Sequence, residues 1–250
     1  MGTVYLVGAG PGAPDLLTLR AARLLGIADI VFYDALVHPE ALALATRAEK
    51  VAVGKRFGKF STAQAFINKR LVDAARKYAV VVRLKGGDPM LFGRAQEEID
   101  ALTHAHIPFE VVPGVSAALA AAAELGVSLT RRGIARSVTF VTPRVGENEV
   151  VSDWQECAAR ADTTALYMGA REAAGIAKEL MRRGRHAEMP VAAVENASLP
   201  GARHWLGTLG TLAQLEQQQF TGPVLLLIGN VLKEQYVARR ILPLERAGAA

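Results

Sequence analysis

A single carboxylate stands in a short loop of glycine and proline, directly after a run of residues typical of a buried strand. Asp88 follows Gly86 and Gly87 and precedes Pro89, and residues 80–84 before them are largely β-branched and apolar. The glycines permit backbone conformations closed to other residues, and the proline keeps Asp88 extended. Because open α/β sheets bind ligands at the carboxyl ends of their strands, we expect a binding site here. A plain turn is the alternative, since the same residue types dominate turns.

A second glycine-rich loop, residues 8–15, follows the first predicted strand at residues 4–7. The spacing Gly8-x-Gly10-x-x-Ala13 satisfies a relaxed dinucleotide-binding fingerprint, and Asp34 stands where an acidic residue would meet a ribose. That fingerprint requires a helix to begin inside the glycine run, so that its N-terminus faces the pyrophosphate. The prolines of the loop and a helix expected only after Thr18 indicate an open loop instead. An oxidoreductase with a nicotinamide or flavin cofactor stays a competing hypothesis.

Composition and charge narrow the class of protein. The chain has 250 residues and one cysteine, Cys157, which excludes an internal disulfide and a cysteine-based metal cluster and fits a reducing cytoplasm. We expect no signal peptide, because the start of the chain lacks a basic region followed by an apolar core. We expect no membrane association, because no apolar run approaches the ~20 residues of a membrane span. The net charge of +5 suggests an anionic partner. Aromatic residues are only 6% and basic residues are scattered, which favours a small polycarboxylate over nucleic acid.

Strand-like and helix-like segments alternate through the first half of the chain, which predicts a parallel α/β domain with right-handed crossovers. Thr18 and Ser61 are the expected N-caps of two of its helices. The second half has strand-like segments at residues 137–142, 164–168, 191–195, 204–207 and 224–228. Several of their connections are too short for helical crossovers, so a mixed sheet is expected there. We place the domains at residues 1–114 and 115–250, with residues 126–135 as a polar, basic link.

Taken together, the motifs of the chain closely resemble those of the tetrapyrrole methylase family over nearly its whole length. The segments that carry the resemblance are Val7-Gly8-Ala9-Gly10-Pro11-Gly12, Tyr33-Asp34, Val53-Gly54-Lys55-Arg56, Arg83-Leu84-Lys85-Gly86-Gly87-Asp88-Pro89, Phe92-Gly93-Arg94, Val112-Pro113-Gly114, Tyr167-Met168-Gly169 and Val194-Glu195-Asn196. The resemblance implies two α/β domains with S-adenosylmethionine folded into the cleft between them, usually in a homodimer. It is strongest to members that methylate uroporphyrinogen III at C2 and C7, giving precorrin-2 for siroheme and cobalamin biosynthesis without a metal.

The resemblance also assigns site residues. Cofactor-binding positions of the family fall on Pro11, Gly86, Gly87, Asp88, Leu91, Ser116, Ala117, Met168 and Ala197, and Asp34 and Lys55 match its proton-handling pair. For Asp34 and Lys55, a surface ion pair beside the loop is the alternative.

Further residues are suggested by spacing and charge. Arg94 and Glu97, three apart on one predicted helix, are a second candidate for the base that removes a proton after methylation. Arg131 and Arg132 are expected to hold substrate carboxylates through bidentate contacts; a solvated linker would show the same charges.

The chain departs from the family pattern after its sixth predicted strand. Thr142-Pro143-Arg144 stands where Thr-Gly-His is usual, Thr130-Arg131-Arg132-Gly133 replaces a common Thr-His-Arg-Asp, and Ala197 replaces a frequent glycine. The added arginines suit a polyanionic substrate. The same departures leave a catalytically impaired tetrapyrrole-binding homologue as a third hypothesis.

Overall fold

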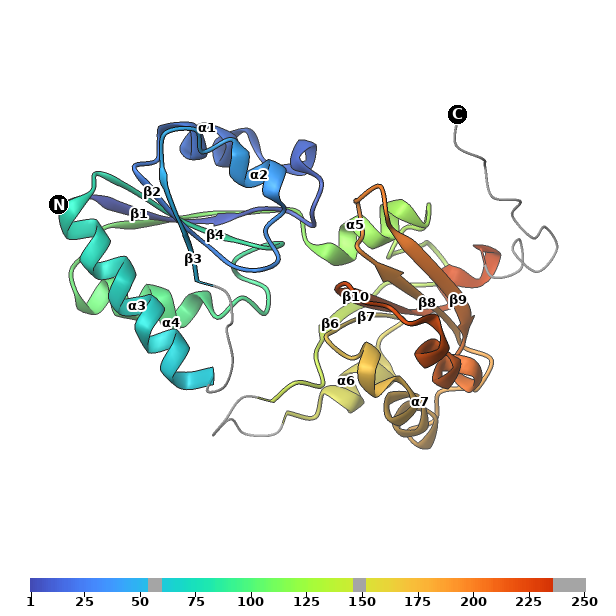
Figure 1. The fold of residues 1–250 in the computed structure, drawn as a ribbon. Helices are drawn as coiled ribbons and strands as arrows, with labels where there is room; N and C mark the ends of the chain where they lie inside the picture. The colour runs from blue at the N-terminus through green and yellow to red at the C-terminus, as the bar shows by residue number, and fades with distance from the viewer. Residues whose placement is uncertain (54–59, 146–151, 236–250) are drawn as a thin grey trace, which may run out of the picture. The chain divides into compact units, whose positions relative to one another are not determined.

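The computed structural model describes residues 1–53, 60–145 and 152–235. The chain forms two compact units, Met1–Ala117 and Ala118–Ala250, so the division falls just after the predicted boundary at Gly114. Each unit is built on one five-stranded sheet (Figure 1).

The sheet of the first unit is entirely parallel and has the strand order β3-β2-β4-β1-β5. Its elements are β1 (Thr3–Gly8), η1 (Pro14–Leu16), α1 (Leu19–Ile27), β2 (Ile30–Tyr33), α2 (Pro39–Ala43), β3 (Glu49–Ala52), α3 (Phe60–Lys77), β4 (Val80–Lys85), α4 (Ala95–His104) and β5 (Phe109–Val112). Figure 1 shows α1 and α2 on one face of this sheet and α3 and α4 on the other.

Side chains that alternate in direction along the strands explain how helices pack on both faces of this sheet. Val4 and Leu6 of β1 are fully buried against the face that α3 and α4 cover, whereas Val7 packs with Leu24 and Leu25 of α1 on the other face. Successive side chains of a strand point to opposite faces, so a continuous apolar run is what a doubly covered strand requires.

The second unit has a mixed sheet in the order β6-β7-β10-β8-β9, in which only β6 and β7 are parallel. Its elements are α5 (Ala117–Glu124), β6 (Val138–Val141), α6 (Trp154–Arg160), β7 (Thr163–Tyr167), η2 (Ala170–Glu172), α7 (Ala173–Arg182), β8 (Pro190–Glu195), β9 (Arg203–Thr208), η3 (Leu209–Gln218), β10 (Val224–Gly229) and η4 (Asn230–Leu232). Two apolar clusters fill the two faces of this sheet.

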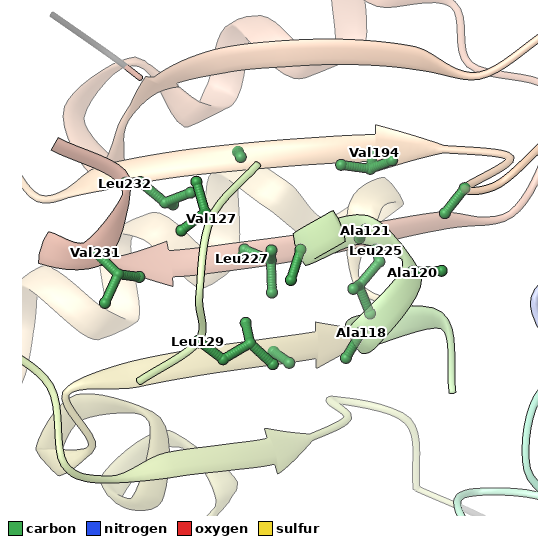
Figure 2. Close-up of a cluster of buried hydrophobic side chains, with 14 of the residues drawn as sticks. Ala118, Ala120, Ala121, Val127, Leu129, Val194, Leu225, Leu227, Val231 and Leu232 are labelled. Atoms are coloured by element: carbon green, nitrogen blue, oxygen red, sulfur yellow. The ribbon is translucent and has the colours of Figure 1, made fainter. Parts of the chain in front are cut away.

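The alanine-rich helix α5 covers one face of the mixed sheet. Figure 2 shows Ala118 and Ala121 over Leu225 and Leu227 of β10. Alanine has no side chain beyond Cβ, so the helix can approach the strands closely while its buried face stays apolar. Residues 126–135 extend this layer, with Val127 and Leu129 buried in the same cluster. The expectation that they link the two units is therefore wrong: they lie inside the second unit, where Val127, Leu129 and Ala135 join its core while the polar residues between them are exposed.

The fold class expected from the sequence is confirmed, and most elements lie within a residue or two of their predicted positions. Thr18 caps α1 as predicted, because its hydroxyl accepts a hydrogen bond from the amide of Ala21 at 3.1 Å. The cap expected at Ser61 is wrong, since α3 begins at Phe60 and Ser61 lies inside it. The segment Leu209–Gln218 forms the 3-10 helix η3. In the described parts of the chain, no helix is long and apolar enough to cross a membrane.

Candidate functional site

The two glycine loops identified from the sequence lie directly against each other. Gly10 donates its amide to the carbonyl of Gly87 at 3.2 Å, and Gly87 donates in return to the carbonyl of Gly10 at 2.7 Å. Both residues have left-handed backbones, with φ of 72° and 70°, which glycine adopts at no steric cost. The loops meet because they follow the carboxyl ends of β1 and β4, which are adjacent parallel strands.

A third strand end joins this contact. A Cβ added to Gly114, after β5, would lie 2.4 Å from the carbonyl oxygen of Gly87, and one added to Gly8 would lie 2.6 Å from the Cα of Gly114. A side chain at either position would push the loops apart. By contrast, a Cβ at Gly87 would meet nothing within 4 Å, so bare main chain faces open space at that point.

Asp88 ties this loop cluster together. Its Oδ1 accepts from the amide of Met90 at 2.8 Å, and its Oδ2 accepts from the amide of Gly114 at 2.9 Å. The sequence interpretation reserved this carboxylate for a ligand, whereas the structure uses both oxygens to hold backbone. Each oxygen keeps a second lone pair, so Asp88 orients the loop and can still accept a hydrogen bond.

The open form of the first loop argues against a dinucleotide site. Residues 14–16 form the short 3-10 helix η1, and α1 begins only at Leu19. No helix N-terminus therefore lies inside the glycine run, where a pyrophosphate would need it.

A buried network of charges supports the strand that carries the Gly86-Gly87-Asp88 loop. The carboxylate of Glu98 is 0% exposed and accepts from Arg83 Nε and Lys85 Nζ, each at 2.9 Å. The side-chain amide of Gln64 approaches the same carboxylate at 3.4 Å. Burial lowers the pKa of Lys85, the neighbouring Arg83 lowers it further, and Glu98 only partly offsets both effects.

Sequence reasoning missed this network, because it read residues 80–84 as a largely apolar strand and assigned no role to Glu98. A signal was nevertheless present. Arg83 and Lys85 are two residues apart and so share a face of β4 with Val81, while Val82 and Leu84 pack on the other face. Two cations on a covered face of a strand require a buried anion.

Asp34 stands at the end of β2, beside this network. Its Oδ1 accepts from the amide of Leu36 at 3.0 Å, while its Oδ2 lies 3.4 Å from the amide of Gly86 and 3.9 Å from Arg83. The side chain of Asp34 is 24% exposed. The structure thus brings Asp34 to the glycine loops, whereas its proposed partner Lys55 lies outside the described residues.

Arg94 and Glu97 are brought together, but not in the way predicted. Arg94 precedes α4 and has a left-handed backbone with φ of 55°, so it is not on the face of that helix. Its guanidinium holds the carboxylate of Glu97 in a bidentate pair, with distances of 2.6 Å and 2.8 Å. Both side chains therefore point toward each other, and the positive charge of Arg94 makes the Glu97 carboxylate a weaker proton acceptor.

The remaining predicted cofactor positions are distributed over both units. Pro11 and Leu91 are half-buried in the glycine loops, and Ser116 and Ala117 are half-buried at the start of α5. In the second unit, Met168 follows β7 with a left-handed φ of 59° and is 46% exposed. Ala197 is buried in the turn after β8, between two residues of left-handed backbone.

The two arginines predicted to bind substrate differ in their surroundings. Arg131 pairs with Glu234 at 2.7 Å, so its guanidinium is engaged within the second unit. Arg132 is exposed, in the turn that the backbone bridge between Arg131 and Ala135 closes. The second unit also contains a cavity of about 530 Å³ at the ends of β7 and β10, and Met168 is part of its lining.

Comparison with known proteins tests the family resemblance inferred from the sequence motifs. The family model described as Tetrapyrrole (Corrin/Porphyrin) Methylases matches residues 3–213. The chain belongs to the tetrapyrrole methylase family. This result confirms the resemblance inferred from the sequence motifs.

Among curated members of the tetrapyrrole methylase family, the chain is 44% identical to a siroheme synthase of Psychrobacter cryohalolentis over 234 residues, which are 93% of this chain and 45% of that protein. It is 47% identical to a siroheme synthase of Chromobacterium violaceum, again over 93% of this chain and 50% of the relative. The chain therefore spans about half the length of the curated relatives it matches.

Solved structures of tetrapyrrole methylases share the fold. Uroporphyrin III C-methyl transferase from Thermus thermophilus matches with a TM-score of 0.82 and 43% identity, over 93% of this chain and 100% of that one. The same values hold for that enzyme in complex with S-adenyl homocysteine. A cobalt precorrin-4 methyltransferase matches with a TM-score of 0.81 and 28% identity, over 92% of this chain and 95% of the other.

Proposed function

We propose that this chain is an S-adenosylmethionine-dependent C-methyltransferase that methylates uroporphyrinogen III at C2 and C7 to give precorrin-2, in siroheme or cobalamin biosynthesis. The family supports this proposal, as does the likeness to a uroporphyrin III C-methyl transferase along its full length. The observation that carries it is the mutual hydrogen bonding of Gly10 and Gly87 at the carboxyl ends of adjacent strands.

The residues of these loops fit a zwitterionic nucleoside. Gly87 presents main chain to open space, and two carboxylates, Asp34 and Asp88, stand at the same loops. We propose that the cofactor is contacted by Pro11, Gly86, Gly87, Asp88, Leu91, Ser116, Ala117, Met168 and Ala197. S-adenosylmethionine supplies the electrophilic methyl group, and S-adenosylhomocysteine is the product.

The protein's main tasks are then alignment and exclusion of water, because the reduced pyrrole carbon is already a nucleophile. The ties through Asp88 and the buried charges below it hold the loops in one arrangement before a ligand arrives, as preorganised sites require.

A proton must leave the macrocycle after methylation, and Asp34 is the better placed acceptor. Among the described residues, its carboxylate accepts from two backbone amides and lies 3.9 Å from Arg83, whereas both oxygens of Glu97 are held at short distances by Arg94. We propose Asp34 as the base and Lys55 as its partner, with Arg94 and Glu97 as the alternative pair.

Calorimetry and turnover test this function. Wild-type protein should bind S-adenosylhomocysteine but not NADH, and should convert uroporphyrinogen III to a methylated product. Asp34→Asn should retain the affinity for S-adenosylhomocysteine and lose at least about 100-fold in kcat, the usual scale of general acid–base catalysis. Asp100→Asn is the matched control, because Asp100 is exposed on α4, where it accepts a hydrogen bond from the side-chain amide of Gln96. Binding of uroporphyrinogen III without turnover would instead support the impaired homologue.

We further propose that the chain acts in the cytoplasm as a homodimer. The single cysteine supports a reducing compartment, and the family resemblance supports the dimer. Sedimentation equilibrium would test the dimer, since a mass equal to that of one chain at micromolar concentration would contradict it.

A further inference from the structure

The cavity of the second unit carries two arginines that no part of the proposed mechanism uses. Arg144 and Arg171 both line it, together with Met168 and Phe220. Both arginines are exposed, and neither forms an ion pair with a carboxylate among residues 1–53, 60–145 and 152–235. One carboxylate, that of Glu216, also belongs to the lining, so the charged groups leave an excess of positive charge.

The local structure brings these two arginines to one place. The amide of Arg144 donates to Thr142 Oγ1 at 3.2 Å, which turns the chain directly after β6. A Cβ at Gly169 would lie 3.3 Å from Cγ of Pro143, so the proline packs against the segment that leads from Met168 to Arg171. The unusual Thr142-Pro143-Arg144 sequence thus places its arginine beside η2.

Another part of the cavity lining, residues 220–222, is held in place by a buried carboxylate. Glu195 is 1% exposed, and its Oε1 accepts from the amides of Thr221 and Gly222 at 2.5 Å and 2.6 Å. Arg203 donates to the other oxygen at 2.6 Å and stacks over the ring of Phe220 at 4.8 Å. The burial of Glu195 would raise its pKa, but Arg203 and the two amides outweigh burial, and the pKa lies below its ordinary value.

We infer that Arg144 and Arg171 bind carboxylate side chains of the tetrapyrrole at this cavity, an inference that rests on the proposed function. A volume of about 530 Å³ is large enough for one pyrrole edge with its acidic arms. Apolar side chains such as Met168 and Phe220 face the ring, and two guanidinium groups are suited to bidentate contacts with carboxylates. Met168 is also a proposed cofactor contact, and methyl transfer requires donor and acceptor to be adjacent.

Steady-state kinetics on Arg144→Gln and Arg171→Gln tests this assignment. Each variant should raise the KM for uroporphyrinogen III about tenfold or more, the scale of one lost hydrogen bond to a charged group, with kcat and the affinity for S-adenosylhomocysteine unchanged. Arg136→Gln is the matched control, because Arg136 is exposed in the same unit and lies outside the cavity. For a tetrapyrrole with methyl groups in place of the acetate arms, each substitution should raise the KM by a smaller factor.

Equilibrium binding of uroporphyrin III, followed by its fluorescence, separates this inference from the proposed function. Weaker binding by both cavity variants than by Arg136→Gln would support the inference even if the protein showed no turnover. Equal binding by all three variants would overturn it while leaving the methyltransferase function intact. A loss of affinity for S-adenosylhomocysteine in either cavity variant would also overturn it, because the cavity would then belong to the cofactor.

Discussion

Replacing Glu98 with glutamine tests whether the buried charges hold the first unit together. Glutamine has nearly the size and helix propensity of glutamate, so the change removes a charge with little effect on packing. Arg83 and Lys85, which are 4% and 3% exposed, would lose the only carboxylate within 3 Å of them in the described structure. Breaking a buried ion pair in this way costs roughly 3–5 kcal/mol.

The structure places the expected loss toward the lower end of that range. Asp34, at 3.9 Å from Arg83, partly balances the remaining positive charge. Removing Glu98 also removes the main effect that raises the pKa of Lys85, so this pKa falls further below its ordinary value of 10.5. In the variant, the pH range in which Lys85 is protonated in the unfolded chain but not in the folded one is therefore wider than in wild type. The free energy of unfolding rises with pH throughout that range. The loss in free energy of unfolding of Glu98→Gln relative to wild type should therefore become smaller between pH 7 and pH 10.

Urea unfolding measured with two probes isolates the effect. Both tryptophans, Trp154 and Trp205, belong to the second unit, so their fluorescence reports on that unit while far-UV circular dichroism reports on both. We expect Glu98→Gln to lower the urea midpoint seen by circular dichroism more than that seen by fluorescence. Glu97→Gln is the matched control, because Glu97 is a partly exposed neighbour paired with Arg94, and such pairs contribute roughly 0–1 kcal/mol. Equal midpoints for the two variants would refute the reasoning.

Three further predictions follow from the loops and from two carboxylates of the second unit. Gly114→Ala, whose Cβ would lie 2.4 Å from the Gly87 carbonyl oxygen, should weaken S-adenosylhomocysteine binding by about tenfold or more in calorimetry. Glu195→Ala should lower the urea midpoint seen by tryptophan fluorescence. The free energy of unfolding should fall by about 2–4 kcal/mol, because the hydrogen-bond donors that Glu195 accepts from are left without their acceptor. Glu179, whose pKa is lowered from 4.5 to about 2 by two neighbouring arginines, adds stability above pH 4.5 that is lost as pH falls toward 2. Glu179→Gln should therefore lose less thermal stability than wild type between pH 5 and pH 2.

For each of these three predictions, one result would contradict the reasoning. Gly26→Ala, where an added Cβ meets nothing within 4 Å, should bind like wild type, and an equal loss in both glycine variants would remove the steric explanation. An unchanged fluorescence midpoint in Glu195→Ala would show that residues 218–222 keep their place without that carboxylate. Parallel acid profiles for wild type and Glu179→Gln would assign the acid sensitivity to other groups.

The order of strands and helices could be predicted because each depends on local patterns. Residues 224–228 are an apolar run typical of a covered strand, and residues 80–84 are apolar except for Arg83. Thr18 has the side chain that an N-cap requires. Met168 and Ala197 were selected through family resemblance, and periodicity gave no reason to choose them.

The partners of charged side chains could not be predicted, because they come from residues far apart in the chain. Glu98 pairs with strand residues 13 and 15 positions before it, and Glu195 holds amides 26 and 27 positions after it. Composition and spacing do not show which carboxylate will meet which cation. The same reason explains why residues 126–135 looked like a link: their charges are evident in the sequence, while the burial of Val127 and Leu129 depends on a sheet formed by later strands.

The contact of Gly8, Gly87 and Gly114 limits how the proposed methyl-donor site can diversify. The three chain segments touch through peptide groups alone. The hydrogen-bond donors and acceptors that these segments present are therefore backbone groups, which stay the same whichever residues flank the glycines. Altering one segment displaces the other two, so the trio changes as a unit or not at all. New acceptor molecules would then be accommodated by substitutions at more peripheral positions, while the chemistry of the donor stays the same.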